Sequence, residues 1–99
     1  MNPETLALAL QIVSTALQIN LQGTWRASVD FVAFNDQSVH VSLYPAHTDF
    51  ELPVRQWPSP NHRGVVLAAT DDGKSSERLQ ALADWLRGFL TVTPEEAAA

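Results

Sequence analysis

The feature that most constrains the fold is the segment Trp25–Phe34, where apolar and polar side chains alternate with a period of two. This period is typical of a β-strand with one buried face. A second alternating segment, Ser38–Tyr44, follows after the turn-like residues Asn35–Gln37. We therefore predict an antiparallel hairpin with strands at Thr24–Phe34 and Ser38–Tyr44. Its apolar face is formed by Trp25, Ala27, Val29, Phe31, Ala33, Val39, Val41 and Leu43.

The pairing register of this hairpin is restricted because cross-strand partners lie on the same face of a sheet. A two-residue loop would place the two apolar sets on opposite faces and is excluded. A three-residue loop, with Phe34 opposite Ser38, places Phe31 opposite Val41 and Val29 opposite Leu43. The other face then carries polar side chains and is expected to stay open to solvent. These are Arg26, Ser28, Asp30, His40, Ser42 and Tyr44.

A third strand is predicted at Gly64–Thr70, which is apolar on both faces, so Val66 and Ala68 would project onto the open face. The connection before it, Pro45–Arg63, is far longer than the usual ~4–6 residues and is rich in proline. Within it Phe50, Leu52 and Val54 alternate, which suggests a short fourth strand at the sheet edge. Phe50, Leu52 and Trp57 are expected to cap the sheet and cover Val66, or to form a partner-binding loop.

A helix is predicted from Pro3 to Gln22, with Asn2 as its N-cap and Gly23 in the left-handed conformation at its end. We expect its inward stripe to consist of Leu6, Leu10, Val13, Leu17 and Leu21. A second apolar set lies away from this stripe, among uncharged polar residues. An uncharged helix of this kind is buried on two sides or faces another chain. The second set, a candidate oligomer interface, consists of Leu8, Ile12 and Ile19.

A second helix is predicted from Ser75 to Leu90, with Trp85 at the edge of its inward stripe beside Phe89. The inward stripe is Leu79, Leu82, Ala83, Leu86, Phe89 and Leu90. The fold class is therefore α+β: a three-stranded antiparallel sheet with two helices on one face, in the order α-β-β-β-α. Residues 1–92 would form a single domain, and residues 93–99 a disordered C-terminal tail.

Composition narrows the function classes. The chain has 99 residues, a net charge of −5, six Lys and Arg residues and no cysteine. Nucleic-acid backbone binding requires a basic stripe and is disfavoured. The N-terminal segment lacks the basic region of a signal peptide, and polar residues interrupt its apolar run. We expect a cytoplasmic protein that does not enter a membrane.

No pattern of catalytic, metal-binding or cofactor-binding residues is predicted. The three histidines lack the spacing of a metal site, although His47 could approach Asp49 and Glu51. Asp30, His40 and Ser42 would lie on a flat sheet surface without oxyanion donors. A small enzyme or metal protein that uses the loop histidines His47 and His62 is kept as an alternative.

The element order α-β-β-β-α resembles that of the double-stranded-RNA-binding domain. The stretch Gly73–Arg78 occupies the position of that family's basic helix start, but it offers only Lys74 and Arg78, with Glu77 between them. The resemblance implies the topology, and a nucleic-acid-binding domain is a second alternative.

Small, acidic, cysteine-free single domains also resemble the inhibitor proteins that bacteriophages and mobile elements use against host defence complexes, anti-CRISPR proteins among them. The leading hypothesis is a non-enzymatic protein-interaction module, an inhibitor or adaptor that binds a protein partner or forms a homodimer. The residues predicted to bind the partner are Asp49, Phe50, Glu51, Arg55, Trp57, Asp71 and Asp72.

Overall fold

The computed structural model describes residues 3–32, 37–67 and 74–98. Its elements follow the predicted order, which confirms the α+β fold class. They are α1 (Pro3–Gln22), β1 (Trp25–Val32), β2 (Gln37–Pro45), the 3₁₀ helix η1 (Val54–Gln56), β3 (Asn61–Leu67), α2 (Lys74–Arg87), the 3₁₀ helix η2 (Gly88–Leu90) and α3 (Pro94–Ala98).

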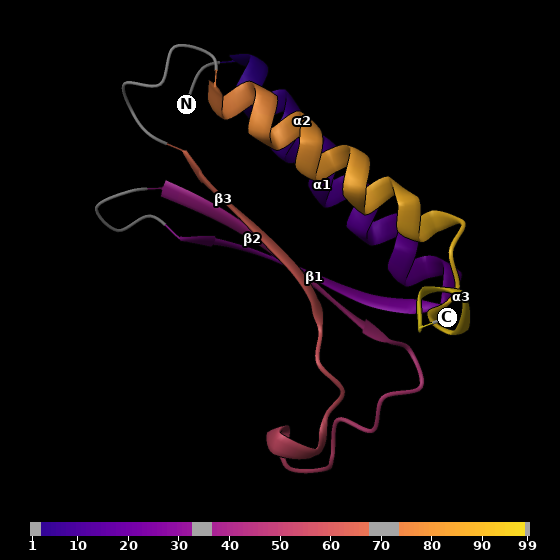
Figure 1. Cartoon of the computed structure of the whole chain (residues 1–99). Helices are drawn as coiled ribbons and strands as arrows, with labels where there is room; N and C mark the ends of the chain where they lie inside the picture. The colour runs from indigo at the N-terminus through magenta and orange to yellow at the C-terminus, as the bar shows by residue number, and fades with distance from the viewer. Residues whose placement is uncertain (1–2, 33–36, 68–73, 99) are drawn as a thin grey trace.

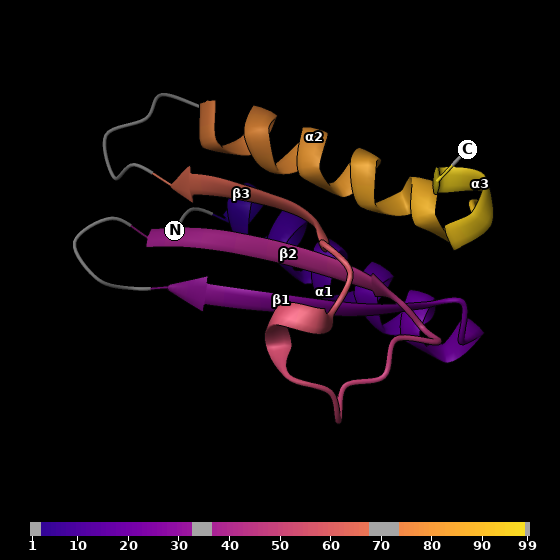
Figure 2. The ribbon, with the colours of Figure 1, turned by 60° about the horizontal axis from the view of Figure 1, so that its bottom comes forward.

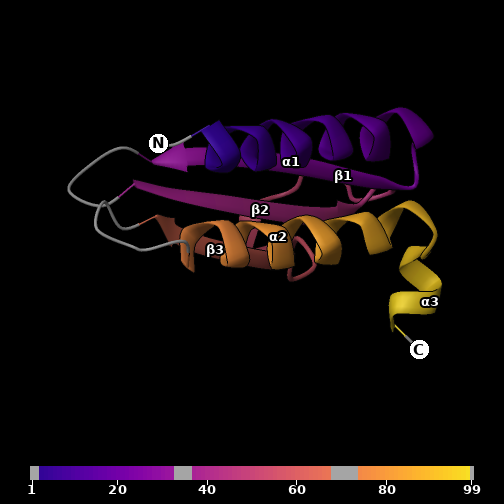
Figure 3. The same cartoon turned by 90° about the horizontal axis from the view of Figure 1, so that it is seen from above.

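The three strands form one antiparallel sheet in the order β1-β2-β3, so β1 and β3 are its edges. Both long helices cover the same face of this sheet, as predicted (Figure 1). Viewed from above, α1 runs alongside β1, and α2 lies over β3 (Figure 3). Gly23 closes α1 with a positive φ of 79°, and its N–H donates to the carbonyl of Asn20.

The predicted hairpin register was wrong by two residues, although its parity was right. Phe31 pairs with Val39 and Val29 with Val41, whereas Phe34 lies outside the described residues. An even shift keeps every side chain on its face, so the apolar pattern cannot distinguish the two registers. The other end of the hairpin decides between them, because Trp25 pairs with Pro45 and the Ala46 N–H donates to the Thr24 carbonyl.

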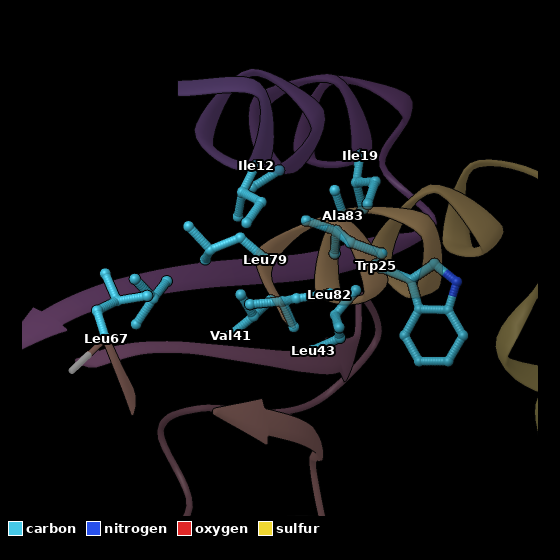
Figure 4. Close-up of a cluster of buried hydrophobic side chains, with 12 residues drawn as sticks. Ile12, Ile19, Trp25, Val41, Leu43, Leu67, Leu79, Leu82 and Ala83 are labelled. Atoms are coloured by element: carbon cyan, nitrogen blue, oxygen red, sulfur yellow. The ribbon is translucent and has the colours of Figure 1, made fainter. Parts of the chain in front are cut away.

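One hydrophobic core fills the space between the helices and the sheet (Figure 4). Ile12 and Ile19 of α1 point towards Leu79 and Ala83 of α2, above Val41 and Leu43 of β2 (Figure 4). The predicted inward stripe of α2 is confirmed, with four of its members buried and the last two half-buried. The remaining core residues include Trp25, Val39, Leu67, Leu82 and Leu86.

The predicted faces of α1 were inverted. Ile12 and Ile19, assigned to an oligomer interface, are fully buried, and Leu8 is half-buried against the same core. The other buried residues of α1 are the small side chains Thr5, Ala9, Thr15 and Ala16. Small side chains let α1 lie close to the core, and the Thr5 and Ser76 hydroxyls lie 3.4 Å apart between α1 and α2. The leucine stripe predicted to face inwards therefore faces solvent.

The long connection differs from the sequence-based prediction at both ends. The fourth strand suggested at Phe50–Val54 is not formed; turns and η1 occupy that region, which projects beyond the sheet (Figure 2). β3 begins at Asn61, three residues earlier than predicted, and so includes His62 and Arg63. Val66 stays exposed rather than being covered by the loop, because the loop packs at the opposite end of the sheet.

The tail predicted to be disordered contains the short helix α3. Thr93 acts as its N-cap. The Thr93 hydroxyl accepts a hydrogen bond from the Glu96 N–H at 3.2 Å and donates one to the Glu96 carboxylate at 3.1 Å. Pro94 occupies the first helical position, where its missing N–H costs nothing. Just before α3, the Val92 carbonyl accepts a hydrogen bond of 2.7 Å from the indole N–H of Trp25.

Candidate functional site

The main candidate site is the outer side of α1. Four leucines lie there, with exposed fractions of 50% for Leu6, 60% for Leu10, 58% for Leu17 and 87% for Leu21. We call these four side chains the leucine flank. Burying a leucine contributes roughly 1.5–3 kcal/mol, so four leucines that stay at least half exposed on one helix mark a candidate contact surface.

The edge of β1 borders the leucine flank, because α1 packs along this strand (Figure 3). Partners in an antiparallel pair alternate between bonding each other and pointing their backbone groups away. The Thr24 carbonyl accepts a hydrogen bond from the N–H of Ala46, which directly follows β2. The backbone groups of even-numbered residues of β1 therefore face β2, and those of odd-numbered residues point outwards. The outward groups are those of Trp25, Ala27, Val29 and Phe31.

Asn20 occupies one of these outward positions. Its side-chain amide donates to the Ala27 carbonyl at 2.9 Å and accepts from the Ala27 N–H at 2.8 Å. The amide thus replaces one residue of a neighbouring strand. The outward N–H and C=O groups of Val29 and Phe31 have no such partner among the residues that the structure describes.

Phe31 adds to the apolar character of this edge. It shares the helix-side face with the buried Trp25, yet it is 51% exposed. Burial along that face declines steadily from Trp25 to Phe31 because the core thins towards the far end of β1. Because Asn20 of α1 bonds the outward groups of Ala27, we place the leucine flank, Phe31 and the open backbone groups on one side of the domain.

A second candidate site lies on the other face of the sheet. Tyr44, Phe50 and Trp57 pack edge to face, with ring centroids 5.0–5.6 Å apart, and the Arg26 guanidinium lies 5.2 Å from the Phe50 ring centroid. These four residues border a groove of about 750 Å³, which we call the aromatic groove. The Trp57 indole N–H donates a hydrogen bond of 2.9 Å to the Leu52 carbonyl.

The residues predicted to bind a partner are divided by the structure. Phe50 and Trp57 are half-buried in the aromatic groove, whereas Asp49, Glu51 and Arg55 are exposed. Asp49 also stabilises its own turn by accepting from the Glu51 N–H at 3.0 Å. The other two predicted residues, Asp71 and Asp72, lie outside the described residues.

The histidines form an arrangement that the sequence did not indicate. His40 and His62 stack on the open face with centroids 5.4 Å apart, and the Ser38 hydroxyl lies 3.1 Å from His40 Nε2. Asp30 is the cross-strand partner of His40, but the hydrogen bond of the His40 ring runs to the Ser38 hydroxyl rather than to Ser42. His47 is exposed in the loop. Across residues 3–32, 37–67 and 74–98, no three metal-ligating side chains converge.

Three of the arginines contact other side chains in different parts of the described fold. Arg26 lies over Phe50, Arg63 lies over the Trp85 ring at 5.0 Å, and Arg87 pairs with Asp84. None of the helices within the described ranges has the length and apolar character needed to cross a bilayer.

Comparisons with protein-family models, with curated proteins and with solved structures found no match for this chain.

Sequence reasoning missed the leucine flank because it assigned the larger apolar set to the core. A signal for the correct face was present. Ala9 and Ala16, and likewise Ile12 and Ile19, recur at a spacing of seven residues on one side of α1. Small residues at such a spacing favour a close helix contact, which large leucines would prevent.

Proposed function

We propose that this protein is a non-enzymatic protein-interaction module and that the leucine flank of α1 is its binding surface. The observation that carries the proposal is the exposure of four leucines, each half or more accessible, on a single helix. Exposed apolar surfaces of this continuity mark contacts with other macromolecules. The absence of any charged residue in α1 other than Glu4 favours an apolar partner surface over a charged ligand.

The proposal is tested by comparing three immobilised baits: the parent chain, Leu10→Glu in the leucine flank, and Leu52→Glu as a matched control. Leu52 is also an exposed leucine but lies in the long connection. We expect a protein to be retained from a lysate of the source cells by the parent and by Leu52→Glu, and lost with Leu10→Glu. Equal retention on all three baits would contradict the assignment.

We further propose that the protein acts as an inhibitor or adaptor of the kind carried by bacteriophages, with the aromatic groove as a second contact surface in addition to the leucine flank. The support for this role is the net charge of −5 together with the exposed carboxylates of Asp49 and Glu51, which flank the aromatic groove at Phe50. Carboxylates beside aromatic anchors suit a basic protein surface. Asp49→Lys with Glu51→Lys would then slow association with such a partner at low salt, whereas an unchanged rate would argue against this role.

A further inference from the structure

We infer that the leucine flank and the edge of β1 bind a second copy of this chain, forming a symmetric dimer with a continuous six-stranded sheet. The inference rests on the proposed function and deepens it, because it commits the interaction surface to one occupant. It is supported by the symmetry of the leucine spacing, by the charge of the chain and by the area available for contact.

The spacing of the leucine flank is self-complementary. The midpoint of Leu6 and Leu21 and the midpoint of Leu10 and Leu17 coincide, between Val13 and Ser14. A two-fold axis through that point brings two antiparallel copies of α1 together with Leu10 beside the partner's Leu17 and Leu6 beside the partner's Leu21. An isologous interface requires such a match, whereas a different partner does not. The half-buried Val13 and the small Ser14 at the axis permit close approach of the helices.

The same axis passes through the middle of the open strand edge. Asn20 bonds Ala27, so these two residues are level with each other along the antiparallel α1 and β1 (Figure 3). The point at which the two-fold axis crosses α1, between Val13 and Ser14, lies about 10 Å from Asn20 towards the N-terminus of the helix, at about 1.5 Å per residue. A distance of about 10 Å along β1 from Ala27 reaches Asp30, at about 3.3 Å per residue.

An axis at Asp30 gives the one register that uses the free backbone groups of the described strand. Val29 pairs with the partner's Phe31, and Phe31 pairs with the partner's Val29, each through N–H and C=O groups that point outwards. A register centred on Val29 would need Ala27, which Asn20 already occupies. In the inferred register Phe31 also gains cover for its exposed ring on the helix side.

Charge and area are both consistent with a second copy. Two chains of net charge −5 repel each other, so they can associate only through a surface poor in carboxylates. The leucine flank contains none, and antiparallel helices align their dipoles favourably. In the inferred register the strand edge brings one carboxylate from each copy, that of Asp30, to the axis. A helix alone offers about 30 Å by 10 Å per copy. The edge of β1 beneath the helix doubles the contact area to on the order of 600 Å² per copy. The total of about 1,200 Å² is the lower limit of stable interfaces.

The dimer is tested by sedimentation of the full chain over a concentration series up to about 1 mM. We expect a dimer that Leu10→Glu and Leu17→Lys each weaken by at least about 100-fold, and that Leu52→Glu leaves unchanged. An equimolar mixture of Leu10→Glu and Leu17→Lys chains should dimerise again, because the introduced charges would face each other. A parent that stays monomeric, or a dimer that Leu10→Glu leaves intact, would overturn the inference.

Two further variants test the strand edge separately. Val29→Pro removes an outward N–H that β2 does not use, so circular dichroism should be unchanged while dimerisation is lost. Asp30→Asn should lower the dimer Kd at least about two-fold, because two Asp30 carboxylates would otherwise meet at the axis. A Kd that is unchanged or raised by Asp30→Asn contradicts this register.

Failure of the dimer is distinguishable from failure of the proposed function. If the parent chain is monomeric but still retains another protein through Leu10, only the inference of a second copy is overturned. A monomeric parent with no retention that depends on Leu10 overturns both.

Discussion

The side-chain amide of Asn20 is hydrogen-bonded to both backbone groups of Ala27, across the turn that joins α1 to β1. The amide ties the end of the helix to the strand edge and completes the hydrogen bonding of one outward position. It also ends the stretch of β1 over which another strand could pair, since the next outward groups belong to Val29.

Replacing Asn20 with alanine should lower the free energy of unfolding by about 1–2 kcal/mol, because two hydrogen bonds to the backbone are lost at an exposed position. Urea denaturation measures this loss. Gln18→Ala is the control, since Gln18 is exposed on the same helix, and its effect should stay within about 0.5 kcal/mol. Equal effects of the two substitutions would show that the amide contributes nothing specific.

The orientation of α1 is tested by comparing two substitutions on opposite faces. Ile12→Ala should destabilise the chain by about 2–5 kcal/mol, because it opens a cavity between α1, α2 and β2. Leu10→Ala, two residues away on the leucine flank, should change the stability of the monomer by no more than about 0.5 kcal/mol. Thermal or chemical denaturation at low protein concentration separates the outcomes, and the reverse order would restore the orientation expected from the sequence.

Trp25 and Trp57 should differ in their contributions to stability. Trp25→Ala should cost about 3–5 kcal/mol, since the ring is fully buried and packs edge to face on Phe89 at 5.0 Å. Trp57→Ala should cost about 1–2 kcal/mol, because Trp57 is half-buried and packs on Tyr44 and Phe50 at the aromatic groove rather than in the core. Guanidinium denaturation gives both values. A larger loss at Trp57 would mean that the long connection belongs to the core.

The close approach of Gly64 to His40 predicts a coupled pair. A Cβ at position 64 would lie 2.5 Å from Nδ1 and 2.8 Å from Cε1 of the His40 ring, so Gly64→Ala must displace the ring from its stack on His62. We expect a loss of about 1–3 kcal/mol. In a double-mutant cycle with His40→Ala, most of that loss should vanish, with a coupling of about 0.5–3 kcal/mol. Additive losses would disprove the contact.

Duplex RNA should not be retarded by this protein in a gel shift at about 50 mM salt. The chain has only six basic side chains, and Arg26, Arg63 and Arg87 already contact Phe50, Trp85 and Asp84. A double-stranded-RNA-binding domain run in parallel serves as the positive control. Retardation that weakens with salt would favour the nucleic-acid alternative.

The sheet was largely predictable from the sequence because side-chain direction in a strand has a period of two. Alternation at Val39, Val41 and Leu43 fixed the buried face of β2 and the parity of its pairing with β1. The register itself was not predictable, since a shift of two residues buries the same side chains. The start of β3 was missed because His62 lies on the open face, where a polar residue carries no strand signal.

The candidate site was less predictable, for a different reason. α1 has two apolar sides and almost no charge, so counting hydrophobic residues favoured the leucines. Burial was decided instead by how closely the helix could pack, which favours Ala9 and Ala16 over bulky neighbours. Within the long connection, the sequence identified Phe50 and Trp57 but not their partners Tyr44 and Arg26, which are brought to them by the sheet.

The bond from the Trp25 indole to the Val92 carbonyl joins the first strand to the segment that follows the last long helix. A shortened chain that ends at Leu90 would keep every strand and both long helices, yet it would leave the indole N–H without its acceptor inside the core. Engineers who fuse a reporter or trim the C-terminus should therefore place the junction beyond Val92.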